Sequence, residues 1–218
     1  MQLMIDNDLR RRVPQLSLGV VIGKVNVTKH VPALWSHIDK YIDELRLSLK
    51  IEDLTSVPEI KAVRDGYRAI GKDPSRYRPS QQALLRRVLQ GKGLFKINSV
   101  VDVNNLISLN SRHSLGSYDL DHTKGPITFR IGANGENYKG IGKDTVNLEG
   151  LPIFSDELGA FGSPTSDSER TMVRLATTRL LMVIISFTGK DGLDNRIKSA
   201  AELLKAYANA EIEATQHL

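Results

Sequence analysis

The chain has 218 residues, of which 40% are hydrophobic and 25% are charged, and its formal net charge is +5. These values fit a folded protein with a full hydrophobic core, either one domain or one domain with a small appended lobe. The absence of cysteine excludes disulfides, thiolate metal ligands and cysteine nucleophiles. No apolar run approaches the roughly 18–20 residues that cross a bilayer, and the N-terminus lacks the order of a secretory signal. We therefore expect a cytoplasmic protein that does not act in a membrane.

The positive charge is concentrated in residues 72–96, called the basic segment below. It contains one acidic residue, Asp73, and seven basic residues: Lys72, Arg76, Arg78, Arg86, Arg87, Lys92 and Lys96. A basic patch of this density is typical of a surface that contacts a phosphate backbone. The alternative is that these residues are the solvated face of an amphipathic helix.

The first 71 residues predict a small αβ portion. Residues 16–27 alternate and are rich in β-branched residues, so they predict a strand. Residues 31–50 and 57–70 carry apolar side chains at helical spacing, and Gly71 ends the second of these helices. The turn at residues 72–75 is short, and we expect the αβ portion (1–71) to pack into the same domain as residues 72–218.

Two more helices are predicted within and after the basic segment, over residues 80–90 and 99–110. Ser80 is predicted to cap the first helix, and Gly91 is predicted to end it in a left-handed conformation. A short strand follows at residues 117–121.

A polar stripe runs along the second of these helices. Asn98, Asp102 and Asn105 lie near one another at helical spacing, and buried polar groups need hydrogen-bond partners. We interpret the stripe as a brace that ties the helix to neighbouring backbone, rather than as a ligand site.

The C-terminal half changes to β-rich sequence and then returns to a helix. Glycine and asparagine at residues 132–135 predict a hairpin turn. Five strands and one helix are expected in this half: strands at 127–131, 137–141, 145–148, 151–155 and 180–185, and an amphipathic helix at 191–210.

Residues 162–171, the hydroxyl-rich segment, are the best candidate for a pocket wall. Small residues let a backbone approach a ligand, hydroxyls can bind an ammonium, a carbonyl or a ribose, and an arginine can bind a carboxylate or phosphate. The alternative is a surface loop that satisfies its own backbone. The candidate substrate-binding residues here are Gly162, Ser163, Thr165, Ser166, Asp167, Arg170 and Thr171.

Tyr118 and Asp119 complete this candidate site. The Tyr118 ring is a possible stacking face for an adenine, or a packed core residue. Asp119 and Asp121 lie two apart in the predicted strand, where a carboxylate could hold an ammonium or position a water. A turn or capping role is the alternative, chiefly for Asp121.

The chain resembles a known family, the aminoacyl-tRNA editing domain. In most bacteria that domain lies within the beta subunit of phenylalanyl-tRNA synthetase, and it also occurs as free-standing proteins. The likeness is closer to the free-standing form and extends over about residues 77–210. The motifs that carry it are Arg78-Pro79-Ser80, Leu84-Leu85-Arg86-Arg87, Asn98, Val101-Asp102, Asn105-Leu106 and Tyr118-Asp119-Leu120-Asp121, with Asp167, Ser168, Arg170 and Thr171 matching a pattern of the free-standing relatives.

The resemblance implies an α+β fold with a mixed β-sheet core and flanking helices. It also implies that residues 72–218 are an editing-type core that binds the aminoacylated 3′ end of tRNA, with the basic segment contacting RNA and the hydroxyl-rich segment lining the aminoacyl pocket. Such a protein can hydrolyse a mischarged aminoacyl ester. For this function, the arginine-bearing helix at 80–90 and the hydroxyl-rich segment must meet at one cleft.

Two departures from the synthetase-borne domain keep other functions open. The position of a histidine in that domain is occupied by Gly116 here. That domain also has a glutamate in the strand that corresponds roughly to residues 180–185, whereas this chain has no acidic residue between Glu169 and Asp191. A non-catalytic module that binds tRNA or an amino acid is therefore an alternative, and a small-molecule hydrolase unrelated to RNA is a third. The histidines show no metal-ligand spacing, so we expect no metal site. We also expect no other cofactor and no DNA partner.

Overall fold

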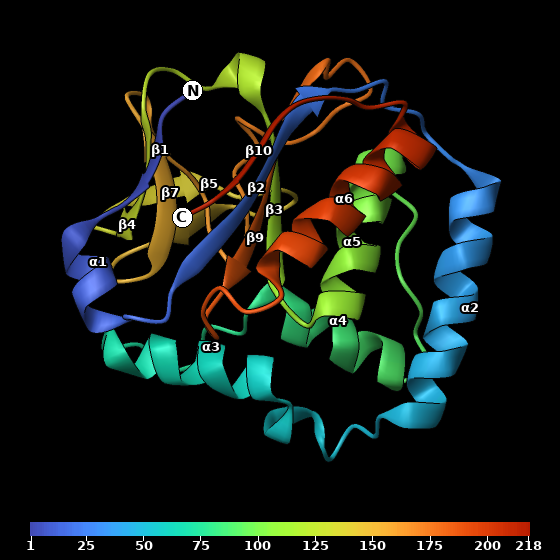
Figure 1. Ribbon diagram of the computed structural model, residues 1–218. Helices are drawn as coiled ribbons and strands as arrows, with labels where there is room; N and C mark the ends of the chain where they lie inside the picture. The colour runs from blue at the N-terminus through green and yellow to red at the C-terminus, as the bar shows by residue number, and fades with distance from the viewer.

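The computed structural model describes all residues from 1 to 218, and its centre is an antiparallel sheet between a helical layer and a second sheet (Figure 1). The central sheet has the strand order β10–β2–β9–β3. Its strands are β2 (Ser17–Lys24), β3 (Ser114–Asp119), β9 (Arg179–Ser186) and β10 (Glu211–His217). The N-terminal strand β2 thus lies between two strands from the end of the chain.

The second sheet has the order β1–β4–β7–β8, and β1 and β4 are its only parallel pair. Its strands are β1 (Leu3–Ile5), β4 (Ile127–Ile131), β7 (Pro152–Asp156) and β8 (Gly159–Gly162). A separate two-stranded ribbon joins β5 (Asn137–Lys139) to β6 (Thr145–Asn147).

The helices confirm the predicted positions to within two residues at each end. They are α2 (Pro32–Ser48), α3 (Pro58–Ala69), α4 (Ser80–Leu89), α5 (Ser99–Ser111) and α6 (Leu193–Ala208), preceded by a short α1 (Asn7–Arg12). Two 3-10 turns are η1 (Leu54–Ser56) and η2 (Leu120–His122). The α+β class with a mixed arrangement of strands and flanking helices is therefore confirmed.

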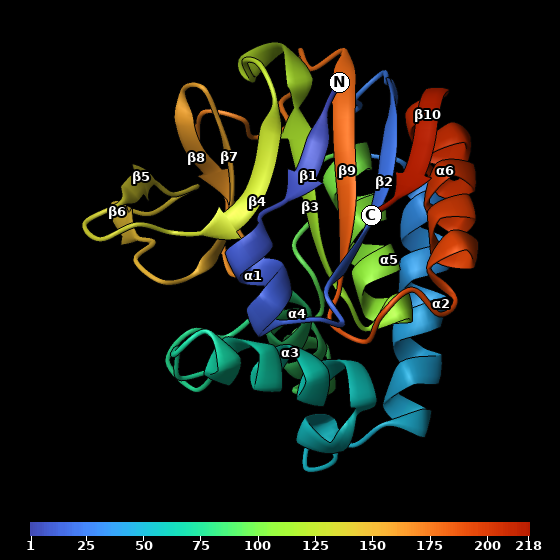
Figure 2. The same ribbon diagram turned by 60° about the vertical axis from the view of Figure 1, so that its left-hand side comes forward.

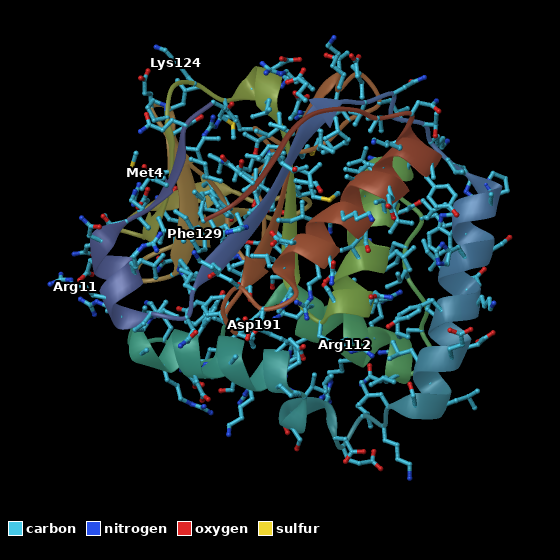
Figure 3. All side chains as sticks on the ribbon, viewed as in Figure 1. Met4, Arg11, Arg112, Lys124, Phe129 and Asp191 are labelled. Carbon is cyan, nitrogen blue, oxygen red and sulfur yellow. The ribbon has the colours of Figure 1, made fainter.

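Alternation along the central strands creates two separate cores. On β9, Met182 and Ile184 face the helices α2, α4, α5 and α6, whereas Leu181 and Val183 face the second sheet. The core on the second-sheet side contains Phe129, which Figure 3 shows in the space between the two sheets. Because both faces of β9 are buried, its sequence is continuously apolar rather than alternating.

The polar stripe on α5 is a brace at two of its positions. The Asn98 side chain caps the helix by accepting a hydrogen bond from the Val101 amide at 3.0 Å. The buried Asp102 carboxylate accepts from Trp35 Nε1 at 2.7 Å and from the Ile97 amide at 3.0 Å. These bonds tie α5 to α2 and to the chain that enters α5, and burial raises the pKa of Asp102.

Several sequence predictions were wrong in their pairing or bounds. The strands at 127–131 and 137–141 do not form a hairpin, because β4 pairs with β1 and β7 while β5 pairs with β6. The strand predicted at 117–121 ends at Asp119 and passes into η2. Ser80 does not cap α4 with its side chain, since Pro79 occupies the cap position.

Four helices or strands were not predicted at all: β1, α1, β8 and β10. Strands β1 and β10 pair with partners that are distant in sequence, and these partners supply the hydrogen bonds that a short or polar strand needs. The prediction that Gly91 ends α4 in a left-handed conformation is confirmed, with φ of 80°.

Candidate functional site

The hydroxyl-rich segment, strand β3 and the first turn of α4 meet at the free edge of the central sheet. The Asp119 amide donates to the Thr171 carbonyl at 2.9 Å, and the Ser80 amide donates to the Pro164 carbonyl at 2.7 Å. Ser114 of β3 contacts Gln81 of α4 and the same Pro164 carbonyl. Segments that are up to about ninety residues apart in sequence therefore form one site.

Three tyrosines from three different elements hold the hydroxyl-rich segment. Tyr118 of β3 donates to the Asp167 carboxylate at 3.0 Å, and Tyr138 of β5 donates to the Ser166 carbonyl at 2.6 Å. Tyr67 of α3 and Thr165 share a hydroxyl–hydroxyl bond of 2.8 Å. Tyr67 and Tyr138 could not be identified from the sequence, because a tyrosine at core spacing gives no sign that its hydroxyl reaches a distant loop.

The turn at the start of the segment satisfies its own backbone. The Ser163 hydroxyl accepts from the Thr165 amide at 3.2 Å and from the Ser166 amide at 3.0 Å, and it donates to the Ser166 carbonyl at 2.8 Å. Part of the predicted loop is not a loop, because Gly162 is the last residue of β8. Ser163 thus takes the self-satisfying role that was the alternative to ligand binding.

Arg170 joins the segment to the hairpin formed by β7 and β8. Its guanidinium makes two bonds of 2.9 Å to the Asp156 carboxylate, and it also donates to the carbonyls of Gly159 and His122. Burial alone would raise the pKa of Asp156, but the hydrogen bonds from Arg170 and from the Lys124 amide outweigh it and lower this pKa. A bidentate pair of this kind fixes geometry, so Arg170 is committed to a protein carboxylate in this structure.

Asp119 is buried, and its carboxylate is also committed to its surroundings. One oxygen accepts from the Thr177 hydroxyl at 2.6 Å, and the other accepts from the Asp121 amide at 3.1 Å. Asp121 lies outside the strand and accepts from Thr178. The premise that both carboxylates project from one strand was therefore wrong, and Asp119 itself caps η2.

Tyr118 fills the space that two glycines leave open. A Cβ atom at Gly116 would lie 2.1 Å from the Tyr118 hydroxyl oxygen, and one at Gly162 would lie 2.3 Å from it. Tyr118 is fully buried, so its ring is not available as a stacking face for a base. The position where the synthetase-borne domain has a histidine cannot carry a side chain here unless Tyr118 moves.

The Asp167 carboxyl has an unusual protonation equilibrium. Burial raises the pKa of Asp167 to about 7, although the hydrogen bonds from Tyr118 and the Ser163 amide act in the opposite direction. Asp167 retains some exposed surface as a residue, but the oxygen that accepts these bonds points toward the buried Tyr118 hydroxyl. The same burial raises the pKa of Tyr118 well above its usual value.

Three buried polar atoms around this edge have no hydrogen-bond partner: Ser168 Oγ, Thr171 Oγ1 and Gln82 Oε1. Gln82 follows Gln81 in the first turn of α4, and Ser168 and Thr171 belong to the segment itself. Such groups are rare in folded proteins and are often explained by a function or by a bound partner. Gln82 was not among the sequence-based candidates.

A hollow of about 480 Å³ lies beside the segment, and Ser168 and Arg170 line it together with residues of β5 and β8. A larger groove of about 670 Å³ lies on the helical side among α2, α5 and α6, and it contains none of the predicted site residues. The structure has no group of three or more side chains suited to hold a metal ion. None of its helices is both long enough and apolar enough to span a membrane.

The basic segment is largely exposed. Arg76, Arg78, Arg86, Lys92 and Lys96 are all exposed. Arg87 is half-buried, donates to the Gly93 carbonyl at 2.8 Å and lies 3.9 Å from the centre of the Phe95 ring. Arg86 and Arg87 are in the last turn of α4, so the turn that meets the hydroxyl-rich segment is the opposite end of the helix from its arginines.

Comparison with known proteins gives a family match and structural likenesses to solved proteins. The crystal structure of an N-terminal fragment of the phenylalanyl-tRNA synthetase beta-subunit from Pyrococcus horikoshii has 13% sequence identity and a TM-score of 0.48. The likeness covers 99% of this chain and 53% of that one, so this chain spans about half the length of the fragment. No curated protein matches.

The pattern of a protein family matches residues 62–207, which is more than half of the chain and contains every residue of the candidate site. That family is described as the B3/4 domain. The chain therefore belongs to the B3/4 domain family.

Proposed function

We propose that this protein binds the aminoacylated 3′ end of a tRNA at the free edge of β3 and hydrolyses a mischarged aminoacyl ester. The observation that carries the proposal is the meeting of α4, β3 and the hydroxyl-rich segment inside the region that matches the B3/4 domain. The basic segment supplies positive charge on the same helix, α4. Family membership and the resemblance to editing domains support tRNA as the substrate class.

The chemistry requires little from the protein. Hydrolysis of an aminoacyl ester needs a positioned water, polarisation of the carbonyl and the nearby ribose hydroxyl, without a protein nucleophile. The Ser168 and Thr171 hydroxyls are buried and have no hydrogen-bond partner in the protein. Both can donate to the substrate once it displaces the groups that cover them. A carboxyl with a pKa near 7, such as Asp167, is suited to accept a proton from water at neutral pH.

A specific observation favours a second candidate, a binding module without turnover. Tyr118 occupies the space where a side chain at position 116 would act, and Asp119, Ser163 and Arg170 are all engaged in holding the fold. A site whose polar groups are used structurally can still bind an RNA end. It then lacks the groups that would lower the barrier to hydrolysis.

The experiment that separates the candidates follows ester loss from tRNA mischarged with each of several amino acids, with and without the protein. We expect turnover above the protein-free rate, and a fall of roughly tenfold or more for Ser168→Ala combined with Thr171→Val, since a lost hydrogen bond of about 1.4 kcal/mol in the transition state changes the rate tenfold. Ser36→Ala, on the exposed face of α2, is the matched control.

Tight binding of the charged tRNA without ester loss supports the binding module. Absence of both binding and turnover contradicts both candidates and leaves a hydrolase that does not act on RNA. Urea unfolding of each variant shows whether a lost activity reflects the site or the fold.

A further inference from the structure

A second positively charged surface lies on α3 and η1, outside the basic segment. It is a groove of about 560 Å³ lined by six residues, none of them apolar. We call it the α3 groove, and its residues are Thr55, Ser56, Lys61, Arg64, Asp65 and Arg68. Hydroxyls, ammonium and guanidinium groups together are the donors that bind phosphate oxygens.

The pattern of α3 separates a buried face from this charged face. Lys61, Arg64 and Arg68 follow one another at i, i+3 and i+7, so they project from the same side of the helix. Arg68 pairs with Asp65 at 2.6 Å, but Lys61 and Arg64 form no ion pair. The groove therefore keeps two uncompensated positive charges that face solvent or a partner.

The buried face of the same helix reaches the candidate site. Tyr67 is fully buried, and its hydroxyl bonds to Thr165 of the hydroxyl-rich segment at 2.8 Å. The α3 groove and the candidate site are thus on two sides of one helix turn. The charged face of α3 is therefore within about one helix diameter, roughly 10–12 Å, of the face that contacts the hydroxyl-rich segment.

The groove also lies near the start of the basic segment. The pKa of Asp73 is lowered mainly by hydrogen bonds from Ser75, and the nearby charges of Arg76 and Arg64 lower it further. Arg64 therefore lies close to the turn that leads into Arg76 and Arg78. Figures 1 and 2 both show α3 and α4 at the same end of the molecule.

The geometry points to the α3 groove as a contact surface for the phosphodiester backbone of RNA, with Lys61 and Arg64 as its principal phosphate ligands. This inference rests on the proposed function and extends it: the tRNA is held by α3 as well as by α4. A lipid surface is the less suitable partner because no apolar side chain lines the groove to enter a bilayer.

The test measures binding of a labelled, deacylated tRNA between 50 and 200 mM salt, a range over which phosphate contacts change affinity strongly. The variant is Lys61→Ala combined with Arg64→Ala, which keeps helix propensity on an exposed face. We expect the slope of log affinity against log salt to become shallower by roughly 1.4–1.8, the value for two lost phosphate contacts. The matched control is Lys198→Ala with Lys205→Ala, two exposed lysines of α6 that form no ion pair.

The outcomes distinguish this inference from the function on which it rests. If the wild-type protein binds tRNA and the α3 variant keeps the wild-type slope, the inference is wrong while the proposed function stands. An equal loss of slope in the α6 control also overturns it, because total charge rather than the groove then sets the affinity. If the wild-type protein binds no tRNA, both the inference and the proposed function fail.

Discussion

The two faces of the central sheet differ in what their cores do. The buried residues of the helical side are aliphatic except for Trp35, and the polar network around Asp102 stays within the helical layer. The second-sheet side contains Tyr67, Tyr118 and Tyr138 among several phenylalanines. These three tyrosines end in hydroxyls that hold the hydroxyl-rich segment.

This difference separates stability from site geometry. Loss of a side chain on the helical side is expected to lower the free energy of unfolding and leave the candidate site in place. Loss of an aromatic residue on the other side is expected to disturb both, because the same rings that fill the core position the tyrosine hydroxyls. The predictions below test this comparison, from the largest expected effect to the smallest.

Phe154→Ala has the largest expected effect. Phe154 is fully buried, and its ring centre lies 4.3 Å from that of Phe129 and 5.6 Å from that of Tyr118. We expect the free energy of unfolding to fall by about 3–5 kcal/mol, measured by urea denaturation. Hydrogen exchange should also become faster in residues 162–171. Leu106→Ala on the helical side is the matched control, and equal acceleration of the loop in both variants would contradict the comparison.

The raised pKa of Asp167 predicts that the free energy of unfolding depends on pH. Its folded pKa is about 7, whereas an unfolded aspartate titrates near 3.9, so the folded state binds more protons between these values. The contribution of this carboxyl to the free energy of unfolding is fully present below about pH 4 and is lost as pH rises toward 7. The free energy of unfolding changes by at most about 1.4 kcal/mol per pH unit. In Asp167→Asn this contribution should disappear. The check is the difference in unfolding free energy between the two proteins from pH 5 to 8, and a constant difference would contradict it.

Gly116→Ala tests whether Tyr118 occupies the space next to this glycine. The new Cβ would lie 2.1 Å from the Tyr118 hydroxyl oxygen, and overpacking of this kind costs about 1–3 kcal/mol. Because the two positions share one space, the cost should be smaller when Tyr118→Leu is already present. A thermal or urea double-mutant cycle measures the coupling, and strict additivity would show that Tyr118 is not the obstacle.

Arg170→Lys is expected to have the smallest effect. Lysine cannot reproduce the two parallel bonds to Asp156 and the bonds to two carbonyls, so we expect a loss of about 1–2 kcal/mol. Arg11→Lys is the control: Arg11 is an exposed partner of Asp8, and Figure 3 shows it at the periphery on α1. That pair should contribute less than about 0.5 kcal/mol. A similar loss in both variants would mean that Arg170 is no more than a surface charge.

Local patterns in the sequence were sufficient to predict helices α2 to α6. The apolar spacing from α2 to α6 and the glycine after α4 depend on residues within a few positions of one another. The positions of most strands were also predictable, since β-branched and apolar runs favour extended chain. Their partners were not, because pairing such as β1 with β4 joins residues more than one hundred positions apart.

The candidate site shows the same limit. The sequence alone determined which residues are chemically suitable, namely the hydroxyl-rich segment, the aspartates near Tyr118 and the basic residues. Only the tertiary structure decided which side chains are engaged: Arg170 is bound to Asp156 and Asp119 to Thr177, while the hydroxyls of Ser168 and Thr171 have no partner. The physical reason is that hydrogen-bond satisfaction and burial depend on groups brought together from distant parts of the chain, and no local pattern carries that information.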